Sequence, residues 1–130
     1  MTQNEKKDLL LKDLCARLPY ELKISVNDKV EKVDGVNVLD NTIEYGSWLS
    51  SEVEEVKPYL FPLSSMTEEQ QKEYRKICDL DMEILENRPM KGEVFPAMYN
   101  SQDWLDAHHF DYRGLIPMGL AIDATGKNIY

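Results

Sequence analysis

The 130-residue sequence has few cysteines, no long apolar run and no cluster of basic residues. No stretch approaches the roughly 18 to 20 apolar residues that cross a bilayer, and the polar start of the chain does not have the form of a signal peptide. Cys15 and Cys78, the two cysteines, lie among apolar neighbours in helical patterns, where a thiol usually packs as a small hydrophobic group. These absences predict a cytoplasmic protein that does not bind membranes.

Basic residues are also too few for a nucleic-acid-binding surface. Lys and Arg number 15 against 24 Asp and Glu, which gives a net charge of −9, and residues 21–60 are the most acidic part. Binding to a phosphate backbone needs clustered Lys and Arg that release counterions, so direct nucleic-acid binding, including binding by a small β-barrel, is not expected. The six glycines are scattered, which excludes a glycine-rich phosphate loop, and no nucleotide or other cofactor is expected.

The residues that are present indicate a single α+β domain spanning residues 1–130. Residues 1–20 predict a helix, because Thr2 and Glu5 have the spacing of a capping box and Pro19 ends the pattern. Charged side chains, Asp13 and Arg17 among them, are expected on its solvent face. Its apolar side chains recur at helical spacing at Leu11, Leu14, Cys15 and Leu18.

Residues 21–63 predict a small antiparallel sheet. Apolar and polar residues alternate over residues 22–26, and Asn27-Asp28 follows as the turn of a hairpin. Asp34-Gly35 fits either a second tight turn or a bulge within one long strand. A meander of three or four such strands covered by a helix resembles an SH3-like half-barrel.

The second half of the chain predicts helices and less regular segments. Two prolines within residues 57–63 favour an edge strand or an extended strap over a central strand. Residues 67–87 predict the longest helix, and residues 88–99 predict a connector. Residues 100–122 predict a short helix followed by an apolar strap across the core, and residues 123–130 are expected to fray.

The stretch with the most chemically active side chains runs from Asp103 to Arg113 and holds both histidines. Aspartate and histidine three residues apart on a helix share one face, as in metal sites of helical bundles. Aspartates in the first turn and histidines in the last turn also suit the helix dipole without any metal, and an imidazole four residues after a tryptophan packs on the indole. A metal-dependent enzyme is therefore the alternative hypothesis, and its ligands would come from Asp103, Asp106, His108, His109 and Asp111.

Nucleophilic catalysis has weaker support. The candidate nucleophiles are Ser64, Ser65, Cys15 and Cys78, and none lies in a nucleophile elbow or beside a partner base in the sequence. We therefore predict no catalytic residues.

The leading hypothesis is a non-enzymatic interaction protein that uses an acidic and aromatic surface. Glu52, Glu54 and Glu55 alternate with valines, which fits the solvent face of an edge strand. They also fit a negative surface that docks a basic protein or mimics nucleic-acid phosphates. Exposed aromatic side chains would strengthen such a surface as binding anchors. The predicted partner-binding residues are Glu44, Tyr45, Trp48, Glu52, Glu54, Glu55 and Tyr59.

Three stretches of the chain look familiar together: Leu9 to Tyr20 (LLLKDLCARLPY), Lys57 to Met66 (KPYLFPLSSM) and Asp103 to Ala121 (DWLDAHHFDYRGLIPMGLA). They resemble a group of small proteins encoded in Bacteroidales genomes, often among prophage and other mobile-element genes. The resemblance covers about a third of the chain. It implies a shared fold and a bacterial or phage cytoplasmic setting, but no activity and no functional residue.

Overall fold

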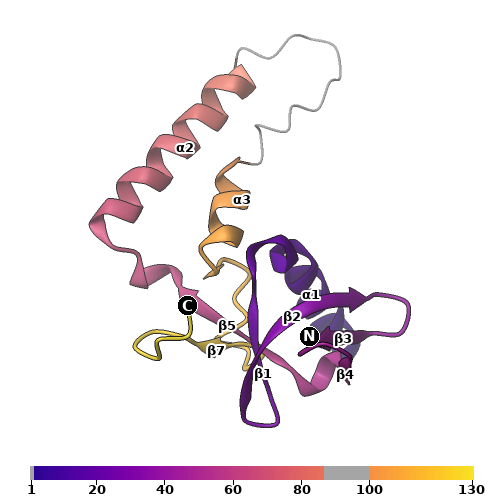
Figure 1. The fold of residues 1–130 in the computed structure, drawn as a ribbon. Coiled ribbons are helices and arrows are strands. Elements are labelled where there is room, and N and C mark those ends of the chain that lie inside the picture. Colours follow the sequence, from indigo (N-terminus) through magenta and orange to yellow (C-terminus); the bar gives the residue numbers. More distant parts are fainter. Residues whose placement is uncertain (1, 87–99) are drawn as a thin grey trace.

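The computed structural model of the chain describes residues 2–86 and 100–130, with side chains for residues 2–80 and 101–130. It confirms the α+β class, with an N-terminal helix, a small and mostly antiparallel sheet, and two C-terminal helices (Figure 1). The sheet is open and has seven strands, two of them paired in parallel, rather than the three or four of the predicted meander. The helices are α1 (Gln3–Arg17), α2 (Glu68–Glu86) and α3 (Asn100–Ala107), and the short 3-10 turns are η1 (Leu18–Tyr20), η2 (Val53–Glu55) and η3 (Leu63–Ser65). Within the described residues, no helix combines the length and apolar content of a membrane-spanning segment.

Helix α1 begins and ends where the sequence indicates, but the prediction of its buried face is wrong by one position. Thr2 caps it through a 3.1 Å hydrogen bond that its hydroxyl accepts from the backbone N–H of Glu5. Cys15, expected to pack as a hydrophobic residue, is exposed, whereas Asp13 and Arg17 are fully buried. The buried stripe consists of Leu10, Asp13, Leu14 and Arg17, with Leu11 beside it.

The sheet has a strand order of β4-β3-β2-β1-β5-β6, and β7 also pairs with β5. Strands β1 to β4 form the predicted antiparallel meander, and β5 runs antiparallel to β1. Strands β6 and β7 pair with β5 in parallel, which the sequence did not indicate. The strands are β1 (Lys23–Val26), β2 (Lys29–Asn37), β3 (Thr42–Tyr45), β4 (Leu49–Glu52), β5 (Lys57–Pro62), β6 (Phe110–Asp111) and β7 (Ile122–Asp123).

The two local ambiguities of the meander are resolved. Asn27 and Asp28 form a two-residue turn with φ values of 51° and 63°, which makes β1 and β2 a hairpin. The register of β2 against β3 shifts between Val33 and Gly35, so β2 is one long strand with a bulge. A tight turn at this point is therefore excluded.

Strand β5 lies inside the sheet, so the prediction of an edge strand or strap at residues 57–63 is wrong. Its two prolines occupy the second and last positions, where they leave the middle of the strand free to pair. Between the prolines, the N–H of Phe61 donates to the carbonyl of His109 at 2.8 Å, and the carbonyl of Leu60 accepts from the N–H of Ala124 at 2.8 Å. The partners come from residues at least 48 positions later in the chain, beyond the reach of local pattern analysis.

Two apolar clusters lie beneath these elements. The larger one packs the leucines of α1 against the inner residues of the sheet, and it includes Leu115 and Ala121 of the predicted strap. The smaller one is centred on Trp104, Leu105 and Phe110 at the base of α2 and α3. The strap prediction is thus confirmed, because residues 115–121 pack on the core.

The prediction that residues 123–130 fray is wrong. The hydroxyl of Tyr130 donates to the carbonyl of Tyr59 at 2.8 Å and accepts from the backbone N–H of Lys23 at 3.0 Å. These bonds tie the end of the sequence to β1 and β5, and Figure 1 shows that end beside β5. The predicted connector at residues 88–99 lies outside the described residues.

Candidate functional site

The two histidines follow α3 directly and point in different directions. His108 stacks on the indole of Trp104, with ring centroids 4.1 Å apart, and its Nδ1 lies 2.8 Å from the carbonyl oxygen of Trp104. This confirms the predicted contact between imidazole and indole. His109 has a left-handed φ of 60°, so it leaves the helix face and stacks on Tyr130 at 4.0 Å.

The aspartates near the histidines are engaged in separate structural contacts. The carboxylate of Asp106 accepts a 2.7 Å hydrogen bond from Tyr112 and lies 3.8 Å from a guanidinium nitrogen of Arg113. Asp111 accepts two backbone N–H bonds, from Leu115 and Ile116, both at 2.9 Å. Asp103 is exposed on α3, so these aspartates and the two histidines have separate surroundings. Across residues 2–80 and 101–130, no group of three or more His, Cys, Asp or Glu side chains is placed to hold a metal ion.

A buried charge network occupies this region instead, and the sequence analysis missed it. Asp13 accepts hydrogen bonds from Arg17 at 2.9 Å and from Arg113 at 2.7 Å. Arg17 also donates to the carbonyl of Phe110 at 2.5 Å. Burial raises the pKa of Asp106, while the hydrogen bond from Tyr112 and the charges of the two arginines oppose that rise. The network ties α1 to the C-terminal segment rather than forming an open site.

The contacts of two candidate nucleophiles, Ser65 and Cys15, do not activate them. The hydroxyl of Ser65 donates to the carbonyl of Pro62 at 2.7 Å, and a carbonyl cannot take up its proton. Desolvation raises the pKa of Cys15, which lowers the fraction of reactive thiolate. These contacts give no support to nucleophilic catalysis.

The acidic surface lies at the other end of the sheet, along β3, the edge strand β4 and the turns on either side of β4. Glu44, Glu52, Glu54 and Glu55 are exposed. Val53 and Val56 are buried, as the alternation in the sequence indicates, but Glu54 and Glu55 lie in the 3-10 turn η2 and only Glu52 is on the edge strand. Glu54 forms an ion pair with Lys7 of α1, so its charge is partly compensated within the chain.

The aromatic part of the predicted surface needs correction. Tyr45 and Tyr59 were expected to be exposed anchors, but both are buried. Tyr45 points inward because it shares a face of β3 with Ile43, and its hydroxyl lies 2.8 Å from that of Ser51. Trp48 alone among the three is exposed, and its side chain is free of contacts that would cover it, with a relative accessibility of 101%.

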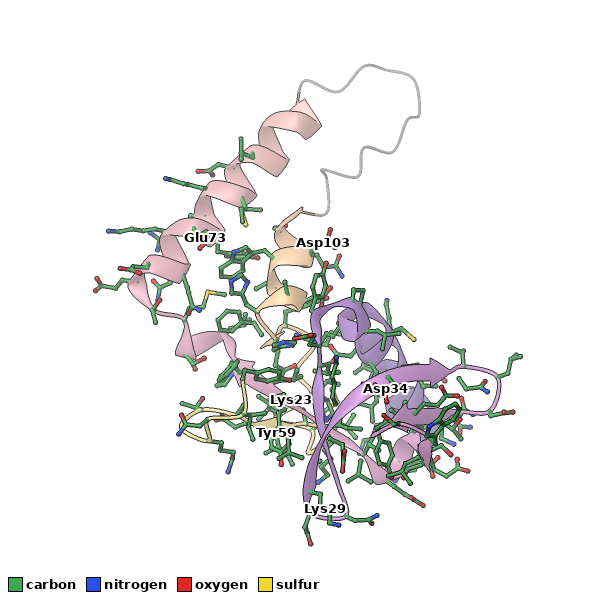
Figure 2. The ribbon with its side chains drawn as sticks, viewed as in Figure 1. Lys23, Lys29, Asp34, Tyr59, Glu73 and Asp103 are labelled. Carbon is green, nitrogen blue, oxygen red and sulfur yellow. The ribbon has the colours of Figure 1, made fainter. Side chains whose placement is uncertain are left out.

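Trp48 stands on a turn that is held in an unusual backbone conformation. Gly46, Ser47 and Trp48 have φ values of 56°, 58° and 91°, a region that bulky side chains rarely adopt. The carboxylate of Asp34, on the bulge of β2, accepts a 3.0 Å hydrogen bond from the N–H of Ser47. Figure 2 shows Asp34 on the sheet, well away from Glu73 on α2. The bulge therefore supports the turn that displays the indole.

A shallow hollow of ≈ 290 Å³ lies beside the indole, lined by Trp48, Leu49, Ser50 and the carboxylate residues Asp34 and Glu44. Gly35 makes room for one of these carboxylates, since a Cβ there would lie 2.9 Å from Oε2 of Glu44. We refer to Asp34, Glu44, Trp48 and Leu49 as the acidic edge site. No protein-family model, no curated protein and no solved structure matches this chain.

Proposed function

We propose that the chain is a non-enzymatic interaction protein that binds a basic, extended segment of a protein partner at the acidic edge site. The observation that carries this proposal is the fully exposed indole of Trp48 beside two carboxylates. Burying an indole on the chain's own core would stabilise the fold by a few kcal/mol, and this one is held on a strained turn instead. A surface aromatic ring with no core to cover suits contact with another molecule.

The chemistry of the site favours a cationic side chain. A lysine or arginine placed over the indole gains a cation–π interaction, and Asp34 and Glu44 supply the opposite charge. The net charge of −9 attracts such a partner from a distance.

The backbone of β4 favours an extended partner. Strand β4 ends the sheet order, and among the described strands only β3 pairs with it. An exposed strand edge of this kind accepts an added strand through main-chain hydrogen bonds. A basic segment in extended conformation would thus align along β4 and place alternate side chains toward Trp48.

The test is the affinity of the chain for a basic, extended peptide, compared with the same peptide in which glutamine replaces every lysine. Trp48→Ala and the pair Asp34→Asn with Glu44→Gln should each weaken binding by about tenfold or more. Binding should also weaken as salt rises from low to physiological concentration.

The matched control moves the charge change to another surface. Glu69, Glu73 and Asp79 are exposed on α2, and changing two of them to the corresponding amide should leave the affinity unchanged. Equal losses in the α2 variant and in the Asp34 and Glu44 variant would mean that total charge, rather than this site, governs binding. Equal affinity for the lysine and glutamine peptides would also contradict the proposal.

We also propose the cytoplasm of a bacterial or phage-infected cell as the setting. Cys15 and Cys78 are both free thiols, as a reducing compartment would maintain them. The resemblance to proteins of Bacteroidales prophages and mobile elements points to the same setting.

A further inference from the structure

A second hollow, far from the acidic edge site, lies where the end of α3 meets η1, β5 and the last residue of the sequence. It has a volume of ≈ 440 Å³ and is lined by five aromatic rings, those of Tyr20, Phe61, His108, His109 and Tyr130. A smaller hollow of ≈ 210 Å³ adjoins it and shares Phe61, His108 and Gln70 as a wall. We refer to the two together as the aromatic groove.

The walls of the aromatic groove are already fixed in place. His108 is held against Trp104, and His109 against Tyr130, with interplanar angles of 28° and 15°. Phe61 contacts the ring of Tyr130 in a tilted arrangement, with centroids 5.9 Å apart. A ligand that enters the groove would therefore not have to order these rings, which lowers the entropic cost of binding.

Both histidines present aromatic surfaces to the groove, and the ring of His109 is neutral. A carbonyl oxygen can only accept, so the 2.8 Å contact with Trp104 places a proton on Nδ1 of His108 and, in the neutral ring, a lone pair on Nε2. Burial, together with the nearby charge of Arg17, lowers the pKa of His109 to about 4, so its ring is uncharged at neutral pH.

Lys23 supplies positive charge at the rim of the groove. Its ammonium donates to the carbonyl of Ile129 at 2.8 Å and lies 5.9 Å from the ring centroid of Tyr130. An ammonium has three donors, so two remain for a ligand. Glu21, the acidic residue that lines the groove, turns its carboxylate toward Lys32 at 3.6 Å. Figure 2 shows Lys23 close to Tyr59, whose carbonyl holds the hydroxyl of Tyr130.

We infer that the aromatic groove binds a small planar aromatic anion, with its ring against the ring faces of the groove and its oxyanion at Lys23. Ring contacts favour an aromatic molecule over a saturated one of the same shape. The ammonium favours a carboxylate or phosphate on that ring. The groove lies at the opposite end of the strand order from β4, so this inference is independent of the proposed partner binding.

Calorimetric titration of the whole chain with matched probes tests this inference. 2-Naphthoate should bind about three- to tenfold more tightly than decahydronaphthalene-2-carboxylate, which has the same skeleton and charge but no ring faces. It should also bind more tightly than 2-naphthalenemethanol, which lacks the charge. Comparison with 2-naphthyl phosphate shows which oxyanion the groove prefers.

Two variants locate the binding. The amide oxygen of Gln70 accepts from the N–H of Thr67 at 3.0 Å, and a glutamate makes the same capping bond, so Gln70→Glu adds a negative charge to the groove with the start of α2 intact. We expect Gln70→Glu to weaken 2-naphthoate binding about three- to tenfold. Gln71→Glu adds the same charge on an exposed position outside the groove, gives up a 3.3 Å hydrogen bond from Gln71 to the carbonyl of Met66, and should leave the affinity unchanged.

Three results would overturn the inference: no binding of either aromatic anion, equal affinity for the aromatic and saturated carboxylates, or equal effects of Gln70→Glu and Gln71→Glu. Trp48→Ala, which removes the anchor of the acidic edge site, should leave 2-naphthoate affinity unchanged. Because this variant should weaken binding of the basic peptide but not of 2-naphthoate, the two proposals can fail independently of each other.

Discussion

At the scale of single residues, Arg17 is the most unusual side chain in the described part of the molecule. It has no exposed surface, and its charge is balanced by Asp13 one helical turn earlier. Removing two ions from water costs several kcal/mol each, and a pair of this kind is tolerated only where further hydrogen bonds satisfy both groups. The carbonyl of Phe110 and the guanidinium of Arg113 supply such bonds, although Nη1 of Arg17 is buried without a hydrogen-bond partner among the described residues.

The network predicts a large loss of stability when one partner is removed. Arg17→Met keeps most of the packing volume but leaves the Phe110 carbonyl without its donor and removes half of the charge that balances Asp13. The free energy of unfolding should fall by about 3–5 kcal/mol in urea denaturation. Lys12→Met removes a positive charge from an exposed position of the same helix and should change it by less than about 0.5 kcal/mol. Similar values for the two variants would rule out the network as a source of stability.

A second prediction at this scale concerns pH. The pKa of His109 is lowered to about 4 in the folded chain, against an ordinary 6.5, so the unfolded chain binds more protons between these values. The free energy of unfolding should therefore decrease as pH falls from 6.5 to 4, with a contribution from His109 of up to about 3 kcal/mol. Asp106 acts in the opposite direction, because its raised pKa favours folding at the acid end.

The His109→Asn variant isolates the contribution of the imidazole. Asparagine tolerates the left-handed φ of 60° and does not titrate, while Asp106 is the same in both proteins. Urea denaturation at pH 7 and pH 4.5 should show a smaller loss of stability for the variant than for the unchanged chain. Identical losses would mean that His109 is not held neutral by burial.

The charged residues of the network could have been recognised only in part from the sequence. Leu10, Asp13, Leu14 and Arg17 have helical i, i+3, i+4, i+7 spacing, and a stripe that mixes leucines with an Asp–Arg pair fits a buried ion pair. The stripe one position later has apolar side chains at all its positions, which made it the more natural assignment. The third member, Arg113, is 100 residues distant from Asp13, so its participation depends on the tertiary fold.

At the scale of secondary-structure elements, the sequence predicted correctly those features that one short segment determines, such as helix caps and tight turns. The capping pair Thr67 and Gln70 exchanges two hydrogen bonds at the start of α2, at 3.0 and 3.1 Å. The turn at Asn27-Asp28 forms because both residues tolerate positive φ. The prediction that β5 is an edge strand was wrong because its place in the sheet depends on pairing with β6 and β7, which residues 110–111 and 122–123 form.

The β1–β2 turn gives a prediction at this scale. A two-residue turn with positive φ at both positions favours Asn-Gly, and Asp28 has a φ of 63°. Asp28→Gly should raise the free energy of unfolding by roughly 0.5–1 kcal/mol, because glycine adopts this conformation without steric cost. Chemical denaturation measures the change. A loss of stability would mean that the side chain of Asp28 contributes more than its backbone strain costs.

At the scale of the whole molecule, the C-terminal segment joins parts of the fold that are distant in sequence. Residues 115–121 pack in the main core, β7 pairs with β5, and Tyr130 bonds to both β1 and β5. The sequence indicated the apolar strap but not the role of the final tyrosine, since a polar and glycine-containing run precedes it. A single aromatic residue after such a run carries no periodicity from which burial can be predicted.

Two substitutions of Tyr130 measure how much its contacts contribute to the free energy of unfolding. Tyr130→Phe removes the hydroxyl bonds to Lys23 and Tyr59 and should cost about 1 kcal/mol of unfolding free energy. Tyr130→Ala also removes the stack on His109 and should cost about 2–3 kcal/mol, less than a fully buried ring because the residue is 44% exposed. Hydrogen exchange at the Lys23 amide should become faster in both variants. An unchanged exchange rate of the Lys23 amide in either variant would mean that Tyr130 does not hold the C-terminal segment against β1.

The bond between Arg17 and Phe110 also has a consequence for synthesis of the chain. The two residues are 93 positions apart, so a nascent chain that carries α1 out of the ribosome has its guanidinium and Asp13 in place long before Phe110 and Arg113 are translated. Until then, burying that ion pair is unfavourable, and α1 cannot dock on the meander in its final form. The main core therefore closes in its final form only after Phe110 and Arg113 have left the ribosome, so an arrested product that ends before Phe110 should remain more exposed to proteases than a longer one.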